Sequence, residues 1–198
     1  MQIDLERKAS SKLLAWKNKP NHSTLEVSGA RQVGKTYLVN KFADREYKRK
    51  IYVNLLELSG EILVSHYRDL IQNMKQGERY ENPVYELIKR YDPTFVDDSD
   101  TVVIIDEIQE SVDIYNRIRE FTRNLACDFI ITGSYRGRIL NDDFKYSAGD
   151  LDAIDIQTLS FEEFLMALGK EKLYQQLDLY GNSSENTYRE LEELYHIY

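Results

Sequence analysis

The sequence predicts a three-layer α/β fold in which helices cover both faces of a five-stranded, mainly parallel sheet. Strand-like and helix-like segments alternate along most of the 198 residues, as parallel strands joined by helical crossovers require. The run Thr101-Val-Val-Ile-Ile105 is β-branched throughout, which is typical of a strand buried on both faces. A glycine-containing loop at residues 29–36 separates the first predicted strand from the next helix. We therefore expect a ligand site at the carboxyl edge of the sheet.

The chain begins with segments that lead into this loop. Residues 5–17 place leucines and Trp16 among basic side chains, which favours an amphipathic helix packed against the core. Trp16 could lie near a bound base, but a core position is the favoured interpretation. Residues 24–28 are strand-like and residues 37–43 are helix-like, so strand, loop and helix occur in the required order.

The loop itself has the pattern of a phosphate-binding site. A glycine and four variable residues precede Gly34, Lys35 and Thr36, and the glycines let the backbone wrap around a phosphate without a Cβ in the way. The loop N–H groups would point inward, and the next helix would offer its positive end to the anion. Lys35 would reach the β- and γ-phosphates, and the Thr36 hydroxyl would bind Mg²⁺. The predicted nucleotide-binding residues are Gly29, Ala30, Arg31, Gln32, Val33, Gly34, Lys35, Thr36 and Tyr37.

The middle of the chain supplies further elements of the sheet and its cover. Residues 50–57 read as a second strand, and the segment from Ser59 onward spaces its apolar residues for one buried helix face. Pro83 suits the first turn of a short helix through Tyr91, and the Asp-Pro pair that follows ends it.

Two carboxylates follow the β-branched strand. Burying Asp106 and Glu107 would be costly, so we expect them to emerge at the edge where open α/β sheets bind ligands. Asp106 would hold the Mg²⁺ shell, directly or through water, and Glu107 would polarise the attacking water. Together with the phosphate loop, this pair indicates a P-loop nucleotidase.

The next segments complete the core. Ser111 can cap a helix whose apolar stripe runs through residues 114–125. A fourth strand is expected over residues 128–134. Ser134, ahead of Thr132, is the favoured candidate for a residue that senses the γ-phosphate, with ordinary strand-end turn chemistry as an equal alternative.

The last third of the chain is less specific. Arg136 and Arg138 could contact phosphate or reach a neighbouring subunit as an arginine finger, but a solvated pair is an equally good interpretation. Residues 151–159 alternate like a fifth strand, and Ser160 with Glu163 would form a capping box. An apolar stripe then runs from residue 188 into the last residue, which we interpret as a chain that stops before its partner elements.

Composition limits the environment in which this fold works. A net charge of −8, a hydrophobic fraction of 42% and the lack of a long apolar run predict a soluble, cytoplasmic protein without a membrane span. Cys127, the single cysteine, is expected to be a buried thiol. A local basic cluster is interpreted as a solvated face rather than a nucleic-acid contact; it consists of Arg45, Lys48, Arg49 and Lys50.

Four motifs, taken together, resemble one group of prokaryotic AAA-type ATPases whose members usually carry a C-terminal domain of poorly assigned role. They are residues 29–36, 104–109, 131–134 and 159–164. The resemblance runs from about residue 8 to residue 198 and implies a sheet of the ASCE type with strand order 5-1-4-3-2. It also implies ATP or ADP and Mg²⁺ as ligands.

The resemblance also sets expectations about domains and departures. It implies an ATP-binding core over residues 1–168, including the N-terminal helix, and the start of a helical lid or linker over residues 169–198. Relatives commonly carry Gly-Arg where this chain has Gly149-Asp150, so an arginine function is not expected there. They also continue past residue 198 into a helical lid and the C-terminal domain.

The favoured function is ATP hydrolysis with Mg²⁺ that drives conformational change in a partner or attached domain. Glu107, Lys35 and Ser134 are the expected catalytic residues, and Thr36 and Asp106 the expected metal ligands. A nucleotide-controlled switch with little turnover is the first alternative. A P-loop small-molecule kinase is disfavoured because Glu107 best supports water activation. Self-association, a protein partner and nucleic acid all stay open.

Overall fold

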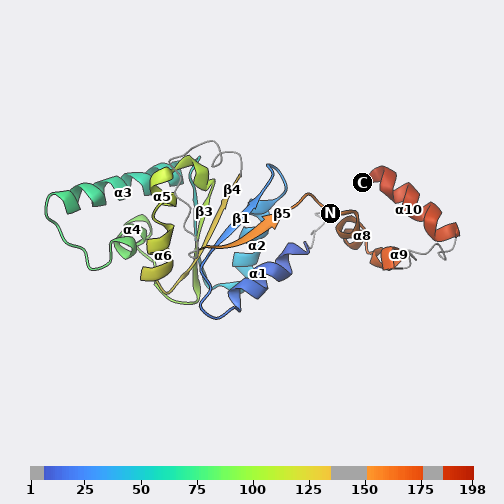
Figure 1. Ribbon diagram of the computed structural model, residues 1–198, viewed down its shortest axis with the longest axis horizontal. Coiled ribbons are helices and arrows are strands. Elements are labelled where there is room, and N and C mark those ends of the chain that lie inside the picture. Colours follow the sequence, from blue (N-terminus) through green and yellow to red (C-terminus); the bar gives the residue numbers. More distant parts are fainter. Residues whose placement is uncertain (1–6, 135–150, 176–184) are drawn as a thin grey trace.

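A parallel sheet of five strands forms the centre of the protein (Figure 1). The computed structural model describes residues 7–134, 151–175 and 185–198. The strands are β1 (Thr24–Gly29), β2 (Arg49–Asn54), β3 (Thr101–Asp106), β4 (Asp128–Gly133) and β5 (Leu151–Ile156). They lie in the order β2-β3-β4-β1-β5 and every neighbouring pair is parallel. Read from the other edge this is 5-1-4-3-2, which confirms the predicted P-loop fold and strand order.

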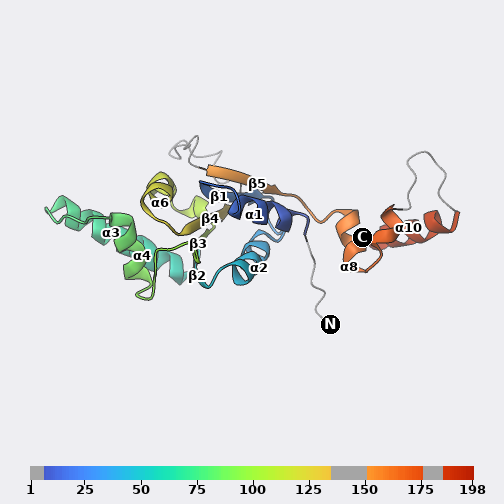
Figure 2. The ribbon, with the colours of Figure 1, turned by 90° about the horizontal axis from the view of Figure 1, so that it is seen from below.

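Helices cover both faces of the sheet (Figures 1 and 2). One face carries α1 (Ala9–Lys17) and α2 (Lys35–Glu46). The other carries α3 (Leu58–Lys75), α4 (Pro83–Tyr91), α5 (Val112–Tyr115) and α6 (Ile118–Asn124), and a 3-10 helix, η1 (Ile108–Glu110), follows β3. Beyond the end of β5, α8 (Phe161–Ala167), α9 (Glu171–Gln175) and α10 (Glu185–Ile197) lie together (Figure 1).

The two faces have separate apolar cores, and β3 contributes to both. Because successive side chains of a strand point to opposite faces, Val103 and Ile105 pack under α3–α6, whereas Val102 and Ile104 pack under α1 and α2. All four side chains are fully buried. At about 25 cal/mol per Å² of apolar surface removed from water, such burial is the main stabilising contribution to the sheet. The β-branched run is therefore buried on both sides, as its composition predicts.

The helix expected after Ser111 is divided into two. The Ser111 hydroxyl accepts a hydrogen bond from the Ile114 N–H at 3.3 Å, as predicted for a cap. The chain then makes a tighter turn, in which the Arg117 N–H donates to the Ile114 carbonyl at 3.1 Å. The Arg117 side chain also donates a hydrogen bond to the Tyr67 hydroxyl at 3.1 Å. The apolar stripe survives this break, because Ile118 is also fully buried.

The C-terminal expectations are confirmed only in part. Ser160 and Glu163 form the predicted capping box. Arg136, Arg138 and the Gly149-Asp150 pair lie outside the described residues, and the domain boundary at residue 168 stays a prediction. Among the residues that the structure describes, there is no helix long and apolar enough to cross a membrane.

A close backbone approach fixes the end of β1. Gly29 has φ +147°, and a Cβ atom built there would lie 2.3 Å from the Ile156 carbonyl oxygen of β5. The phosphate loop can therefore begin where it does only because residue 29 has no side chain.

We predict that Gly29→Ala lowers the free energy of unfolding by about 2–4 kcal/mol, since backbone atoms must move apart. Gly77→Ala is the matched control: Gly77 also has positive φ, +103°, but nothing lies within 4 Å of the position that a Cβ atom would take there. It should cost only about 1 kcal/mol of conformational strain. Urea unfolding measures both values, and equal losses would show that the contact with β5 is unimportant.

Candidate functional site

The phosphate loop borders a pocket of about 510 Å³ at the carboxyl edge of the sheet. The loop leaves β1 at Gly29 and enters α2 at Gly34, whose φ of +88° places it in the left-handed region. Gln32 also has positive φ, +64°. The pocket is lined by Arg31, Gln32, Gly34, Lys35, Thr36, Tyr37, Leu56, Glu107 and Ser134. Most of the residues predicted to bind nucleotide therefore gather around one cavity, together with Glu107 and Ser134.

The remaining predicted loop residues support the loop rather than line the pocket. The Lys35 ammonium donates to the carbonyls of Gly29 at 3.1 Å and Ala30 at 2.8 Å. Val33 is buried at 8% exposure and packs in the core shared with α1 and α2. The Lys35 ammonium thus binds backbone carbonyls of the loop itself, and an anion in the pocket would compete for the same ammonium group.

Asp106 is the most deeply buried charged group described at this edge, with 2% exposure. One carboxylate oxygen accepts hydrogen bonds from the Thr36 hydroxyl at 2.7 Å and from the Tyr52 hydroxyl at 2.8 Å. The other accepts from the Thr132 hydroxyl and from the Glu107 backbone N–H at 2.9 Å. A buried carboxylate requires such partners, because leaving it unpaired in a medium of low dielectric costs several kcal/mol, by a rough estimate.

The same oxygen atoms are suitable ligands for Mg²⁺. This ion prefers hard oxygen donors and usually combines one or two carboxylates with water and phosphate oxygens. The Thr36 hydroxyl and the Asp106 carboxylate are already in contact at 2.7 Å, so the chemistry of the donor set fits the ion. Within the described ranges, no cluster of three or more His, Cys, Asp or Glu side chains could form a site by itself. A metal here would depend on the phosphates as well.

Glu107 and Ser134 both line the pocket. Glu107 has φ +54° and ψ +46°. The chain therefore turns sharply after β3, and Glu107 does not continue the direction of the strand. Ser134 follows β4, is 8% exposed and lines the pocket, whereas Thr132 is fully buried and bonded to Asp106. The geometry gives the two candidate sensors different neighbours, and the sensing role of Ser134 stays a prediction.

Arg7 makes contacts that the sequence did not predict. Its guanidinium donates to the Val33 carbonyl in the loop at 2.9 Å, to the Gln157 carbonyl after β5 at 2.7 Å, and to the Glu163 carboxylate at 3.1 Å. Burial opposes ionisation of Glu163, but hydrogen bonds from the Ser160 and Lys8 N–H groups and from Arg7 outweigh it and lower its pKa. Because these partners are distant in sequence, no local pattern around Arg7 indicates its position.

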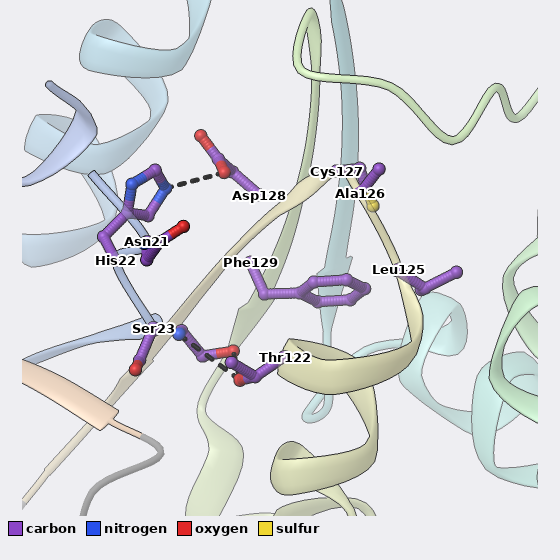
Figure 3. A pocket seen from close by; sticks show the side chains of 10 residues that line it. Asn21, His22, Ser23, Thr122, Leu125, Ala126, Cys127, Asp128 and Phe129 are labelled. Atoms are coloured by element: carbon purple, nitrogen blue, oxygen red, sulfur yellow. Dashed lines mark hydrogen bonds and ion pairs between the residues drawn. The ribbon is translucent and has the colours of Figure 1, made fainter. Parts of the chain in front are cut away.

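A second cavity, of about 270 Å³, lies at the opposite edge of the sheet (Figure 3). His22, in the loop before β1, contacts Asp128 through Nε2 at 2.8 Å and the Lys19 carbonyl through Nδ1 at 2.9 Å. Trp16 packs edge-on against the ring at a centroid distance of 4.6 Å and is 5% exposed. This confirms the core position of Trp16.

The basic cluster of residues 45–50 is neutralised locally. Its four cations each contact a carboxylate, in the pairs Arg45–Glu46, Lys48–Asp100, Arg49–Asp98 and Lys50–Asp44. Such pairs contribute little to stability at a solvated surface. They do, however, reduce the charge that this face presents to a polyanion, in agreement with the solvated interpretation.

Comparison with protein families gives one match, a family model described as AAA domain that covers residues 21–165. This range begins before β1 and ends within α8, so it contains the loop, both carboxylates and all five strands. No curated protein sequence matches the chain.

Several solved structures are similar to the chain. One is the Aeropyrum pernix ORC1 protein in complex with DNA, with a TM-score of 0.53, 17% identity, and 86% of this chain and 50% of that one covered. The ORC2 protein of the same organism gives a TM-score of 0.42 at 16% identity, with 81% of this chain and 48% of that one covered. A STAND protein with a tetratricopeptide repeat sensor from Pyrococcus horikoshii gives a TM-score of 0.44 at 20% identity, with 100% of this chain and 33% of that one covered. The first likeness shows a shared fold, and the chain spans half or less of each of these proteins.

We predict that Tyr52→Phe lowers stability at pH 7 by about 1–2 kcal/mol, because it removes one donor to a buried carboxylate. Burial, and then the hydrogen bond to Asp106, raise the pKa of Tyr52 in the folded protein. Its contribution is therefore complete below the unfolded pKa of about 10 and is lost as pH rises above that value. Urea midpoints should show the gap between wild type and variant narrowing above about pH 10. A constant gap would contradict this assignment.

Proposed function

The chain belongs to the AAA domain family, and from this premise we propose that it binds ATP with Mg²⁺ and hydrolyses the γ-phosphate. The observation that carries the proposal is the convergence of Lys35, Thr36 and Glu107 on one pocket, with Asp106 directly behind Thr36. The pocket volume of about 510 Å³ is within the range of small-molecule sites. A cation, hard oxygen donors and a half-buried carboxylate are what in-line attack by water on a phosphate needs.

Each residue would have a separate task in this reaction. The loop N–H groups and the N-terminus of α2 would bind the phosphates, and Lys35 would exchange its contacts with the Gly29 and Ala30 carbonyls for phosphate oxygens. Thr36 and Asp106 would hold Mg²⁺, which when bound neutralises charge on the β- and γ-phosphate oxygens. Glu107 would orient the attacking water and accept its proton.

The consequence of turnover would be a change in position of the elements attached to the loop. Arg7 joins the loop carbonyl of Val33 to the carboxylate of Glu163 in α8, so a loop that moves with its ligand would pull on α8. We propose that this movement acts on a partner protein, a second copy or an attached domain. Nucleic acid is not favoured, because the basic cluster is paired with carboxylates. The single cysteine is buried, which fits a reducing compartment such as the cytoplasm.

Two substitutions separate binding from hydrolysis. Lys35→Ala should weaken binding of ATP with Mg²⁺ by at least about 10-fold, because a charge-assisted contact to phosphate is lost. Glu107→Gln should retain binding and slow phosphate release by about 10²–10³-fold, since the amide cannot take the proton. Calorimetric titration and phosphate release on the same samples provide the measurements.

Asp113→Asn is the matched control, because Asp113 lies nearby in α5 but is exposed and outside the pocket lining. It should leave both quantities unchanged. Equal loss of binding in Lys35→Ala and Glu107→Gln would exclude Glu107 as the base. Tight binding without release in the wild type would favour the nucleotide-controlled switch.

A further inference from the structure

Gln109 lies between Glu107 and the end of β4, and the proposed reaction has given it no role. Its side-chain amide N–H donates to one Glu107 carboxylate oxygen, and its amide oxygen accepts the Ser134 backbone N–H at 3.3 Å. We propose that Gln109 is a positioning residue that orients the Glu107 carboxylate and links it to the end of β4. This inference rests on the proposed hydrolytic function of Glu107.

The two neighbours fix which way the amide points. A carboxylate only accepts hydrogen bonds and a backbone N–H only donates them. The NH₂ group must therefore face Glu107 and the carbonyl oxygen must face Ser134, because the reversed amide would lose both contacts. Glutamine is thus matched to this position in a way that glutamate is not, since a second carboxylate would face Glu107 with like charge.

The backbone brings Gln109 into this place. Glu107 adopts the left-handed conformation, with φ +54°, and η1 begins at the next residue. Ile108 is fully buried, so the 3-10 helix is anchored under the sheet edge and turns Gln109 back toward Glu107. A left-handed conformation is strained for a non-glycine residue, because its Cβ atom crowds the backbone. The turn therefore holds Glu107 and Gln109 together at the expense of local strain.

Gly133 leaves the space that the amide occupies. A Cβ atom built on Gly133 would lie 2.6 Å from the Gln109 amide oxygen and 3.1 Å from the Ile108 Cγ2 atom. Its φ is not positive, so the backbone conformation alone does not require glycine there. The requirement comes from Gln109, whose flexible end would have to move if residue 133 carried a side chain.

The hydrogen bond also leaves part of Glu107 available for chemistry. Gln109 occupies one carboxylate oxygen, and among the residues that the structure describes none donates a hydrogen bond to the other. Glu107 and Ser134 both line the pocket. A ligand contact that shifts the end of β4 would therefore be passed through Gln109 to the carboxylate that faces the same pocket.

The test compares Gln109→Ala, Gln109→Glu and Gly133→Ala with wild type, and uses Asp113→Asn as the control. We expect Gln109→Ala to lower kcat at least about 10-fold with ATP affinity changed less than about 2-fold, and Gln109→Glu to lower kcat further. Gly133→Ala should also lower kcat, because the added Cβ atom displaces the Gln109 amide while residue 109 remains a glutamine. In a Glu107→Gln background, Gln109→Ala should cause almost no additional loss, because the two residues act as a unit.

The outcomes separate this inference from the proposed function. Wild-type kcat in Gln109→Ala, beside an inactive Glu107→Gln, would overturn the role of Gln109 alone. If wild type releases no phosphate, or Glu107→Gln releases it equally fast, the proposed function fails. The contact between Gln109 and Glu107 is then tested by urea unfolding of Glu107→Ala, Gln109→Ala and the double variant. Additive midpoint shifts would overturn it, and a double variant less destabilised than the sum would support it.

Discussion

The buried carboxylate of Asp106 is the interaction on which the rest of the site depends. Its four hydrogen-bond donors come from the start of α2, from β2, from β4 and from the turn after β3. Each donor satisfies part of a charge that could not otherwise remain at 2% exposure. Because the donors belong to separate elements, the carboxylate also fixes the phosphate loop and the three strands relative to one another at the edge where the pocket forms.

This arrangement gives the same atoms a structural role and, in the proposed reaction, a functional one. The Thr36 hydroxyl stabilises Asp106 through their hydrogen bond, and it is also the group that would turn toward a metal ion. A ligand would then replace one internal hydrogen bond by another set of contacts, while Tyr52 and Thr132 keep the carboxylate in place. Local rules of stability are commonly broken where function requires it, and the left-handed Glu107 beside Asp106 is such a position.

Local patterns were sufficient to predict the sheet, the loop and both carboxylates, and the family resemblance implied the strand order. The period of apolar residues identifies strands and helices, and the loop has a spacing that phosphate chemistry requires. Contacts between distant segments could not be read in the same way. Tyr52 of β2 donates to Asp106 of the neighbouring strand β3, Arg7 contacts a carboxylate 156 positions later, and His22 in the loop before β1 contacts Asp128 of β4. The break at Arg117 was also missed, because the apolar stripe continues through it.

The position of β1 has a consequence for how the protein is made. β1 is the first strand in the sequence, but it lies between β4 and β5, the last two. β2 and β3 can pair soon after synthesis, whereas β1 must wait for β4, which ends at Gly133, and gains its second neighbour only when residues up to Ile156 have left the ribosome. Pairing across such sequence separations is slow, because a long loop must close before any contact rewards it. The nucleotide loop at the end of β1 is therefore completed late, and nucleotide can assist only the final stage of folding.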